Sequence, residues 1–192
     1  MDIVFASHNA HKRAEVEAIM AAIWPEVRLV APIGEAPDET GDTFEENALI
    51  KAQAGHAATG APTIADDSGI CVDALDGQPG VRSARYSQGG ADQDNLWLLL
   101  ENLGDATERQ AHFVCAVAFV ADGEEHVLER SWHGSIAMAP AGSGGFGYDP
   151  IFIPEGESVT AAELAPEDKS AVSHRGQAFR ALADFLRVWR GA

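Results

Sequence analysis

The chain has 192 residues, of which 46% are hydrophobic and 22% charged, as in an ordinary globular protein. These proportions exclude a disordered chain, a collagen and a coiled coil, and the length predicts a single domain over residues 1–192. Thirteen Lys and Arg against 30 Asp and Glu leave a formal net charge of −17. Such a charge disfavours nucleic acid polymers and anionic membranes as partners, whereas a small anion can still bind where cations and a metal ion converge.

The sequence shows neither a membrane span nor a secretion signal. No apolar run approaches the roughly 18 residues that cross a bilayer, and the first residues lack a basic region followed by an apolar one. We therefore expect a cytoplasmic protein. Cys71 and Cys115 each lie in an apolar run without Cys or His at metal-ligand spacing, so we expect two buried thiols.

The first part of the chain alternates strands and helices. Residues 2–6 predict a buried strand, and apolar positions 16, 19, 20 and 23 have helical spacing until Pro25 ends the helix. Residues 27–30 predict a second strand, and the Pro, Gly and acidic residues of 31–42 predict an exposed loop. This order is typical of an α/β fold, in which we assume that the two strands are parallel.

A second helix and a turn follow. Thr43 and Glu46 have the spacing of a capping box for a helix that runs to about Thr59, with Gly60 ending it. Residues 63–75 (TIADDSGICVDAL) predict two short strands around a corner at Asp-Asp-Ser-Gly, and DGQPG at 76–80 predicts a turn.

The rest of the chain predicts two helices and three strands. Leucines at 96, 99, 100 and 103 indicate a helix, and the apolar run 112–121 indicates a central strand. Asp122-Gly123 predicts a tight turn to a returning strand through Trp132. A glycine-rich loop at 142–150 leads into a short strand at 151–153, and apolar positions from 179 to 189 predict a final amphipathic helix.

Residues 7–12 (SHNAHK) lie between the first strand and the first helix. Backbone N–H groups at a helix N-terminus attract phosphate, and Lys12 adds a positive charge. The alternative is an ordinary N-cap by Ser7 or Asn9 on a solvated helix start. The stretch does not match the P-loop pattern.

Several carboxylates are candidates for a metal site. Glu39 lies in the acidic loop, Glu46 opens the second helix, and Asp66 and Asp67 are adjacent. Mg²⁺ prefers one or two carboxylates completed by substrate phosphates and water. Because neighbours in an extended strand face opposite sides, only one Asp of the pair should enter a given cleft. The alternatives are that the Asp pair turns the chain, that Glu46 only caps its helix, and that Lys51 is solvated.

Three later segments also contain candidate ligand-binding residues. GGFGYD at 144–149 combines glycines with two aromatic rings that could face a base, although it could be an ordinary mobile hairpin. SHRG at 173–176 opens the last helix, where Arg175 can present several donors or lie in a plain capped helix. Arg82 and Arg85 could equally bind phosphate or form surface ion pairs.

The motifs ASHNAHK, TFEENALIKA, ADDSGI, DGQPGVRSARY, GGFGYDPIF and DKSAVSHRGQAF occur in this order. This ordered set resembles the inosine triphosphate pyrophosphatase family, also called Ham1-like, over about residues 3–187. The resemblance implies an α/β fold with a mixed central sheet flanked by helices, two lobes around an active-site cleft, and a homodimer. It also implies hydrolysis of ITP, dITP and XTP to the monophosphate and pyrophosphate with Mg²⁺.

The resemblance assigns roles to residues of this sequence. Glu39 and Asp67 correspond to the family's metal-associated carboxylates, and Asp67 also to its proposed general base. The residues that correspond to substrate contacts, or that fit the phosphate clamp, are Ser7, His8, Asn9, Ala10, His11, Lys12, Lys51, Ser68, Phe146, Gly147, Tyr148, Asp149, Lys169, His174 and Arg175. His8 is a departure, because the family usually has a glycine there.

The implied chemistry is coherent. Asp67 could activate a water that attacks the α-phosphorus, while a metal ion, Lys12 and Lys51 neutralise the leaving pyrophosphate. Donors of Arg175 would be satisfied by a 6-oxo purine and left unpaired by a 6-amino purine. Two other functions stay open: a nucleotide sensor without turnover, and a pyrophosphatase for pyrimidine or modified nucleotides.

Overall fold

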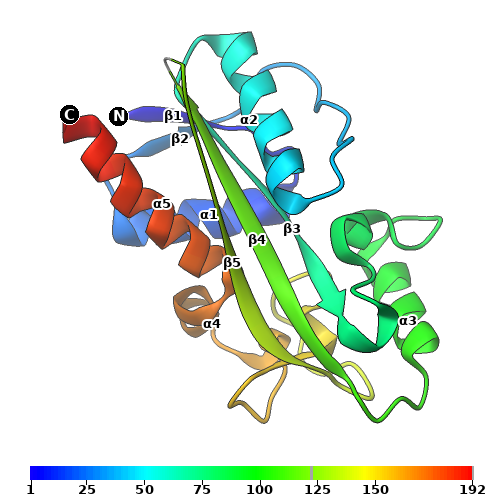
Figure 1. Ribbon diagram of the computed structural model, residues 1–192. Coiled ribbons are helices and arrows are strands. Elements are labelled where there is room, and N and C mark those ends of the chain that lie inside the picture. The colour runs from blue at the N-terminus through cyan, green and yellow to red at the C-terminus, as the bar shows by residue number, and fades with distance from the viewer. Residues whose placement is uncertain (122, 192) are drawn as a thin grey trace. The chain divides into compact units, whose positions relative to one another are not determined.

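The computed structural model describes residues 1–121 and 123–191 (Figure 1). The strands are β1 (Asp2–Phe5), β2 (Arg28–Val30), β3 (Thr63–Val72), β4 (Gln110–Ala121), β5 (Glu124–Ile136) and β6 (Phe152–Pro154). The helices are α1 (Ala10–Ile23), α2 (Phe44–Thr59), α3 (Asp92–Leu103), α4 (Pro166–Val172) and α5 (His174–Gly191). Short 3₁₀ turns are η1 (Asp73–Leu75), η2 (Gly80–Arg85), η3 (Asp149–Ile151) and η4 (Ala161–Glu163).

The strands form one sheet in the order β2-β1-β3-β4-β5-β6. β1 is parallel to both β2 and β3, whereas β5 and β6 are antiparallel. β4 and β5 are neighbours joined by two residues, and such a short connection is possible only for an antiparallel hairpin. The predicted mixed sheet with flanking helices is therefore confirmed. Asp122 of the predicted turn lies outside the described residues.

The chain divides into two compact units that share β3, β4 and β5. Unit 1 contains residues 1–67 and 115–130 and the C-terminal segment from 175, and unit 2 contains residues 68–114 and 131–174. Each unit has its own hydrophobic cluster.

In unit 1, alternate residues of the strands face different helices. Ile3, Phe5 and Ile64 pack into a cluster with α1 and α5, and the Phe5 ring meets Phe179 edge-on at a centroid distance of 5.9 Å. The intervening residues face α2, where Gly55 lies against Ala6 and Thr63. The sheet edge of unit 1 is thus covered by α1 and α5 on one face and by α2 on the other (Figure 1).

In unit 2, aromatic rings from three strands form the centre of the hydrophobic cluster. The ring of Phe113 lies 4.8 Å from that of Phe152, and Trp132 lies 5.1 Å from Phe152. Leucines of α3 complete the cluster, as their helical spacing predicted. His174, the first residue of α5, stacks on Phe113 at a centroid distance of 4.7 Å.

Several local predictions are confirmed. Thr43 and Glu46 form the capping box of α2, and Gly60 ends that helix with a left-handed φ of 66°. Asn9 is the N-cap of α1, since its side chain accepts from the Lys12 N–H. Within the described ranges, no helix has both the length and the apolar character of a bilayer span.

Two predictions were wrong. β3 is one ten-residue strand rather than two pieces around a corner, because its residues are buried on both faces and the Asp66 and Asp67 side chains find cations without leaving the strand. Cys71 is only half-buried, whereas Cys115 is fully buried as predicted.

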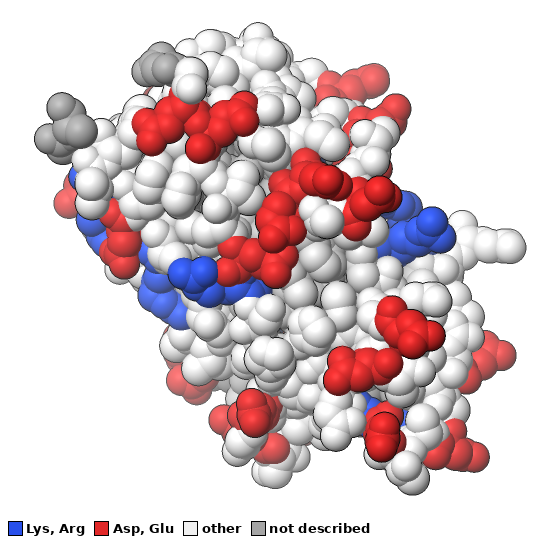
Figure 2. All heavy atoms as spheres, in the orientation of Figure 1, with Lys and Arg blue, Asp and Glu red and all other residues white. Residues whose placement is uncertain are grey.

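The surface reflects the composition. On the face seen in Figure 2, Asp and Glu atoms form several separate groups and Lys and Arg are few. Such a surface disfavours contact with polyanions.

The close approach of α2 to the sheet predicts the effect of a substitution. A Cβ at Gly55 would lie 2.8 Å from the Thr63 Cγ2 and 3.1 Å from the Ala6 Cβ. Gly55→Val should therefore lower the free energy of unfolding by about 1–3 kcal/mol, as overpacking does. Ala58→Val, on the exposed side of the same helix, should cost no more than about 0.7 kcal/mol. Urea unfolding compares the two variants, and equal losses would contradict this packing.

Candidate active site

The two-residue period of β3 places Asp66 and Asp67 on opposite faces of unit 1. Ile64 belongs to the cluster with α1 and α5, so Asp66 points to the same face. Thr63 lies against α2, so Asp67 points to the α2 face. Each carboxylate meets cations from the helices of its own face.

On the α2 face, Lys51 joins two carboxylates. Its Nζ lies 2.6 Å from Glu39 Oε1 and 2.8 Å from Asp67 Oδ1. The alternative of a solvated Lys51 was wrong: its side chain is only 11% exposed. The reason is helical spacing, because Ala48, Lys51 and Gly55 are all buried on the side of α2 that faces the sheet.

On the other face, Asp66 joins α1 to α5. The Lys12 Nζ lies 3.4 Å from Asp66 Oδ2, and the Arg175 Nε and Nη2 each lie 3.5 Å from the same oxygen. The Arg175 guanidinium also donates to Glu15, one turn after Lys12 on α1. Sequence reasoning missed Glu15, although its i+3 spacing from Lys12 on a predicted helix could have indicated it.

The charged groups of this cluster shift one another's pKa values. Burial alone would raise the pKa of Asp66, but Lys12, Arg175 and Lys51 together lower it. Burial alone would lower the pKa of Lys51, but Asp67, Asp66 and Glu39 together raise it. Asp66 and Lys51 are therefore held in their charged forms.

Asp67 differs from its neighbour. Burial raises the pKa of Asp67 above its ordinary value, and the attraction of Lys51 and Lys12 does not cancel this effect. One carboxylate oxygen on each residue, Asp66 Oδ1 and Asp67 Oδ2, is buried without a hydrogen-bond partner among the described residues. A buried carboxylate oxygen of this kind gains from a proton or a cation beside it.

This donor set fits a hard divalent cation. Asp67 has a buried oxygen without a hydrogen bond, and Lys51 bridges Asp67 to Glu39. In the described part of the chain, no three His, Cys, Asp or Glu side chains are grouped to hold a metal ion. Mg²⁺ needs only one or two carboxylates when substrate phosphates and water complete its shell, so two suffice.

The candidate residues 7–12 form the start of α1 and the segment just before it, in unit 1. Ser7 is buried, Asn9 caps the helix, and Ala10 begins it, followed by His11 and Lys12. The Nε2 of His8 lies 3.1 Å from the Gly34 carbonyl oxygen, so the larger side chain at this position contacts the loop that carries Glu39.

In unit 2, the glycine-rich loop is held around Asp149. The Asp149 Oδ2 accepts from the Phe146 N–H at 2.8 Å and from the Lys169 Nζ at 2.6 Å. The Lys169 ammonium also lies 5.5 Å from the centroid of the Phe146 ring. A Cβ at Gly145 would lie 2.0 Å from Asp149 Oδ2, so only glycine fits there. Asp149 thus connects the loop to α4.

The remaining predicted residues are also placed within one unit each. Gly147 donates its N–H to Asp92, and the Tyr148 hydroxyl donates to the Ser83 carbonyl at 2.8 Å. Ser68 is a half-buried residue of β3 in unit 2. The candidates therefore divide into a group in unit 1 around Asp66 and Asp67 and a set of residues in unit 2, of which Phe146 and Lys169 contact Asp149. Arg82 and Arg85 are exposed on η2.

The model of the Ham1 family matches residues 3–185 of this sequence. The chain belongs to the Ham1 family. It is 51% identical to a Streptomyces coelicolor protein named dITP/XTP pyrophosphatase, with 98% of each chain covered.

Solved Ham1-family structures have the same fold. A HAM1 protein from Coxiella burnetii matches with a TM-score of 0.88 and 39% identity, covering 97% of this chain and 98% of that one. A nucleoside-triphosphatase / dITP/XTP pyrophosphatase from Mycobacterium abscessus matches with a TM-score of 0.75 and 51% identity, covering 95% of this chain and 97% of that one.

The two adjacent aspartates of this Ham1-family protein should respond oppositely to the same substitution. Asp67 holds its proton to a higher pH when folded, so the native state loses stability as pH rises through the raised pKa. Asp67→Asn should therefore increase the free energy of unfolding at neutral pH, with Lys51 still paired to Glu39, and the gain should vanish in acid.

Asp66 contributes stability that is lost as pH falls through its lowered pKa. Asp66→Asn should therefore destabilise the protein at neutral pH, by an amount that shrinks in acid. Urea unfolding from about pH 2, below the ordinary Asp pKa of 3.8, up to pH 8 measures both variants. Destabilisation by both substitutions at neutral pH would overturn the assignment of the raised pKa to Asp67.

Proposed function

We propose that this Ham1-family protein hydrolyses non-canonical purine nucleoside triphosphates, namely dITP, ITP and XTP, to the monophosphate and pyrophosphate. Relatives about 50% identical over nearly their whole length are named dITP/XTP pyrophosphatases. The structural observation that supports the proposal most is the Glu39–Lys51–Asp67 cluster, in which Glu39 is half-buried and the buried Asp67 has an oxygen without a hydrogen-bond partner among the described residues. The activity would remove deaminated purines from the nucleotide pool.

Glu39 and Asp67 are proposed to hold the divalent cation, which we take to be Mg²⁺. When bound, the cation supplies positive charge against the triphosphate oxygens. Glu39 and Asp67 offer carboxylate oxygens, and these suit Mg²⁺ better than zinc. Lys51 keeps both carboxylates in place and remains charged beside them.

Asp67 is proposed as the general base. A water molecule attacks the α-phosphorus, Asp67 takes its proton, and the bond from the α-phosphorus to the bridging oxygen breaks, so pyrophosphate leaves with the electron pair. A base works best when its pKa is near the working pH, and burial moves the pKa of Asp67 in that direction. Lys12 and Lys51 are proposed to neutralise the charge on the leaving pyrophosphate.

The start of α1 is proposed to bind the triphosphate. Residues 7–12 offer backbone N–H groups at the positive end of a fourteen-residue helix, together with the Lys12 ammonium. Ser68, Phe146–Asp149, Lys169 and His174 of unit 2 are proposed to contact the nucleoside, with Arg175 donating to a 6-oxo group. A homodimer in the cytoplasm, where free nucleotides are used, completes the proposal.

A substrate panel tests this function. Pyrophosphate release is measured with Mg²⁺ on dITP, ITP, XTP, GTP, ATP and dTTP. We expect the 6-oxo, non-canonical purines to give the highest kcat/KM. A preference for dTTP would favour the pyrimidine alternative, and nucleotide binding without pyrophosphate release would favour a sensor.

The role of Asp67 predicts a large loss of turnover. Asp67→Asn should reduce kcat for dITP by roughly 10²-fold or more, the usual effect of removing a general base. Asp66→Asn, which changes the neighbouring carboxylate on the other face, should reduce it less. Excess chelator should abolish wild-type activity, and Mg²⁺ should restore it. Full activity in chelator would refute the metal-assisted mechanism, and a greater loss from Asp66→Asn would refute the choice of base.

Base selection predicts a contrast between two cations. Arg175→Ala should lower the ITP over ATP preference in kcat/KM by roughly 10- to 150-fold, since a charge-assisted hydrogen bond contributes about 1.5–3 kcal/mol. Lys12→Ala should lower kcat/KM for ITP and ATP by similar factors, because both substrates carry the same triphosphate. If Arg175→Ala slows both substrates by one factor, Arg175 acts instead as the support that links Glu15 to Asp66.

A further inference from the structure

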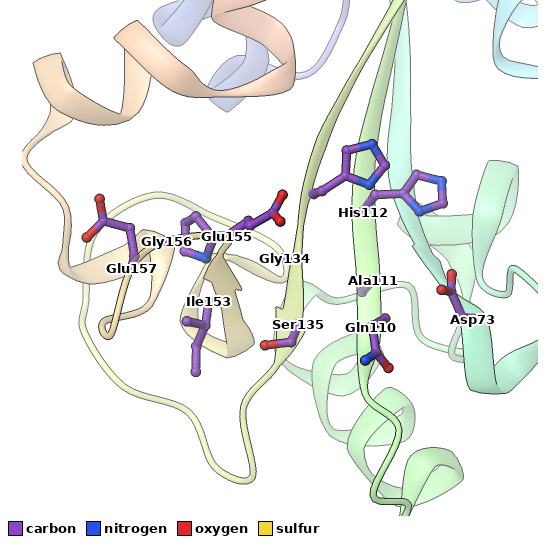
Figure 3. Close-up of a pocket in the computed structure, with 12 residues that line it drawn as sticks. Asp73, Gln110, Ala111, His112, Gly134, Ser135, Ile153, Glu155, Gly156 and Glu157 are labelled. Carbon is purple, nitrogen blue, oxygen red and sulfur yellow. The ribbon is translucent and has the colours of Figure 1, made fainter.

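Unit 2 contains a cavity of about 460 Å³ that involves none of the residues assigned to catalysis. Figure 3 shows its lining residues on β4, β5 and the segment of β6, with Asp73 just after β3. Two histidines, His112 of β4 and His133 of β5, lie in its wall together with Asp73, Glu155 and Glu157. The cavity is therefore lined by metal-ligating and acidic side chains.

The two imidazoles lie side by side. Their ring centroids are 5.4 Å apart, and the rings are tilted by 34°. An unbroken antiparallel register counted from Ala121 and Glu124 places position 133 opposite position 112, which agrees with this contact. The pair thus spans two neighbouring strands whose spacing is set by the sheet.

This spacing matches that of two ligands on one ion. A tetrahedral ion with metal–nitrogen bonds of about 2.0 Å places two ligating imidazole centroids about 5 Å apart. His133 is exposed and His112 half-buried, so an ion from solvent can reach the pair.

We propose that His112 and His133 form a two-histidine chelate for a divalent transition-metal ion of the zinc type. Imidazole ligands select such ions over Mg²⁺. Since the described residues offer no group of three side chains placed to ligate an ion, water supplies the remaining ligands. Asp73, Glu155 and Glu157 add negative charge around the cavity. A bound ion would tie β4 to β5 and stabilise the folded protein.

Zinc titration tests the chelate. Calorimetry with ZnCl₂ is run on the full chain in excess Mg²⁺, which competes for the carboxylate site of unit 1. The variants are His133→Ala, His112→Asn and a control, His126→Gln, which removes an imidazole of β5 that stacks on Phe185 in unit 1. We expect one zinc site in the wild type and in the control, and at least about a 10-fold loss of affinity in the other two variants.

A second measurement separates binding from folding. Zinc should raise the Tm of the wild type and of the control but not that of His133→Ala, whose Tm without zinc should match the wild type because the residue is exposed. Pyrophosphate release in Mg²⁺ alone should be unchanged in His133→Ala, so this proposal and the proposed function fail independently. Absence of zinc binding in the wild type, unchanged affinity in His133→Ala, or an equal loss in His126→Gln would overturn the proposal.

Discussion

The alternation of side chains along β3 is the constraint on which the site in unit 1 depends. Adjacent aspartates must face opposite sides of the sheet, and a buried carboxylate is costly unless a cation meets it there. α1 and α5 supply Lys12 and Arg175 to Asp66, and α2 supplies Lys51 to Asp67. The same ion pairs that compensate burial therefore hold the helices in place and set the electrostatic character of each carboxylate.

The scarcity of lysine in this acidic chain has a structural explanation. The sequence has only three lysines, and each is paired with a buried carboxylate: Lys12 with Asp66, Lys51 with Asp67, and Lys169 with Asp149. Their side chains are 15%, 11% and 7% exposed. All three lysines thus lie among the candidate residues, while the net charge of the chain is −17. This distribution suits recognition of a small polyphosphate and disfavours nucleic acid polymers.

Local patterns predicted most of the elements, and the errors concern tertiary contacts. The capping box at Thr43 and the spacing of the α3 leucines are encoded in neighbouring residues, so they could be predicted. The continuity of β3 could not be predicted, because Asp-Asp-Ser-Gly has the composition of a turn. It stays extended only because cations from distant parts of the sequence pair with the two aspartates. Lys51 and Glu15 acquire their roles from partners on other elements, which sequence spacing alone does not reveal.

The central claim is that water activated by Asp67 attacks the α-phosphorus of a non-canonical purine nucleotide. Hydrolysis of dITP in ¹⁸O-labelled water, followed by mass spectrometry of both products, tests it most directly. The account predicts that the label enters dIMP and that the pyrophosphate remains unlabelled. Label in pyrophosphate, or release of inorganic phosphate instead, would place the attack on the β- or γ-phosphorus and contradict the account.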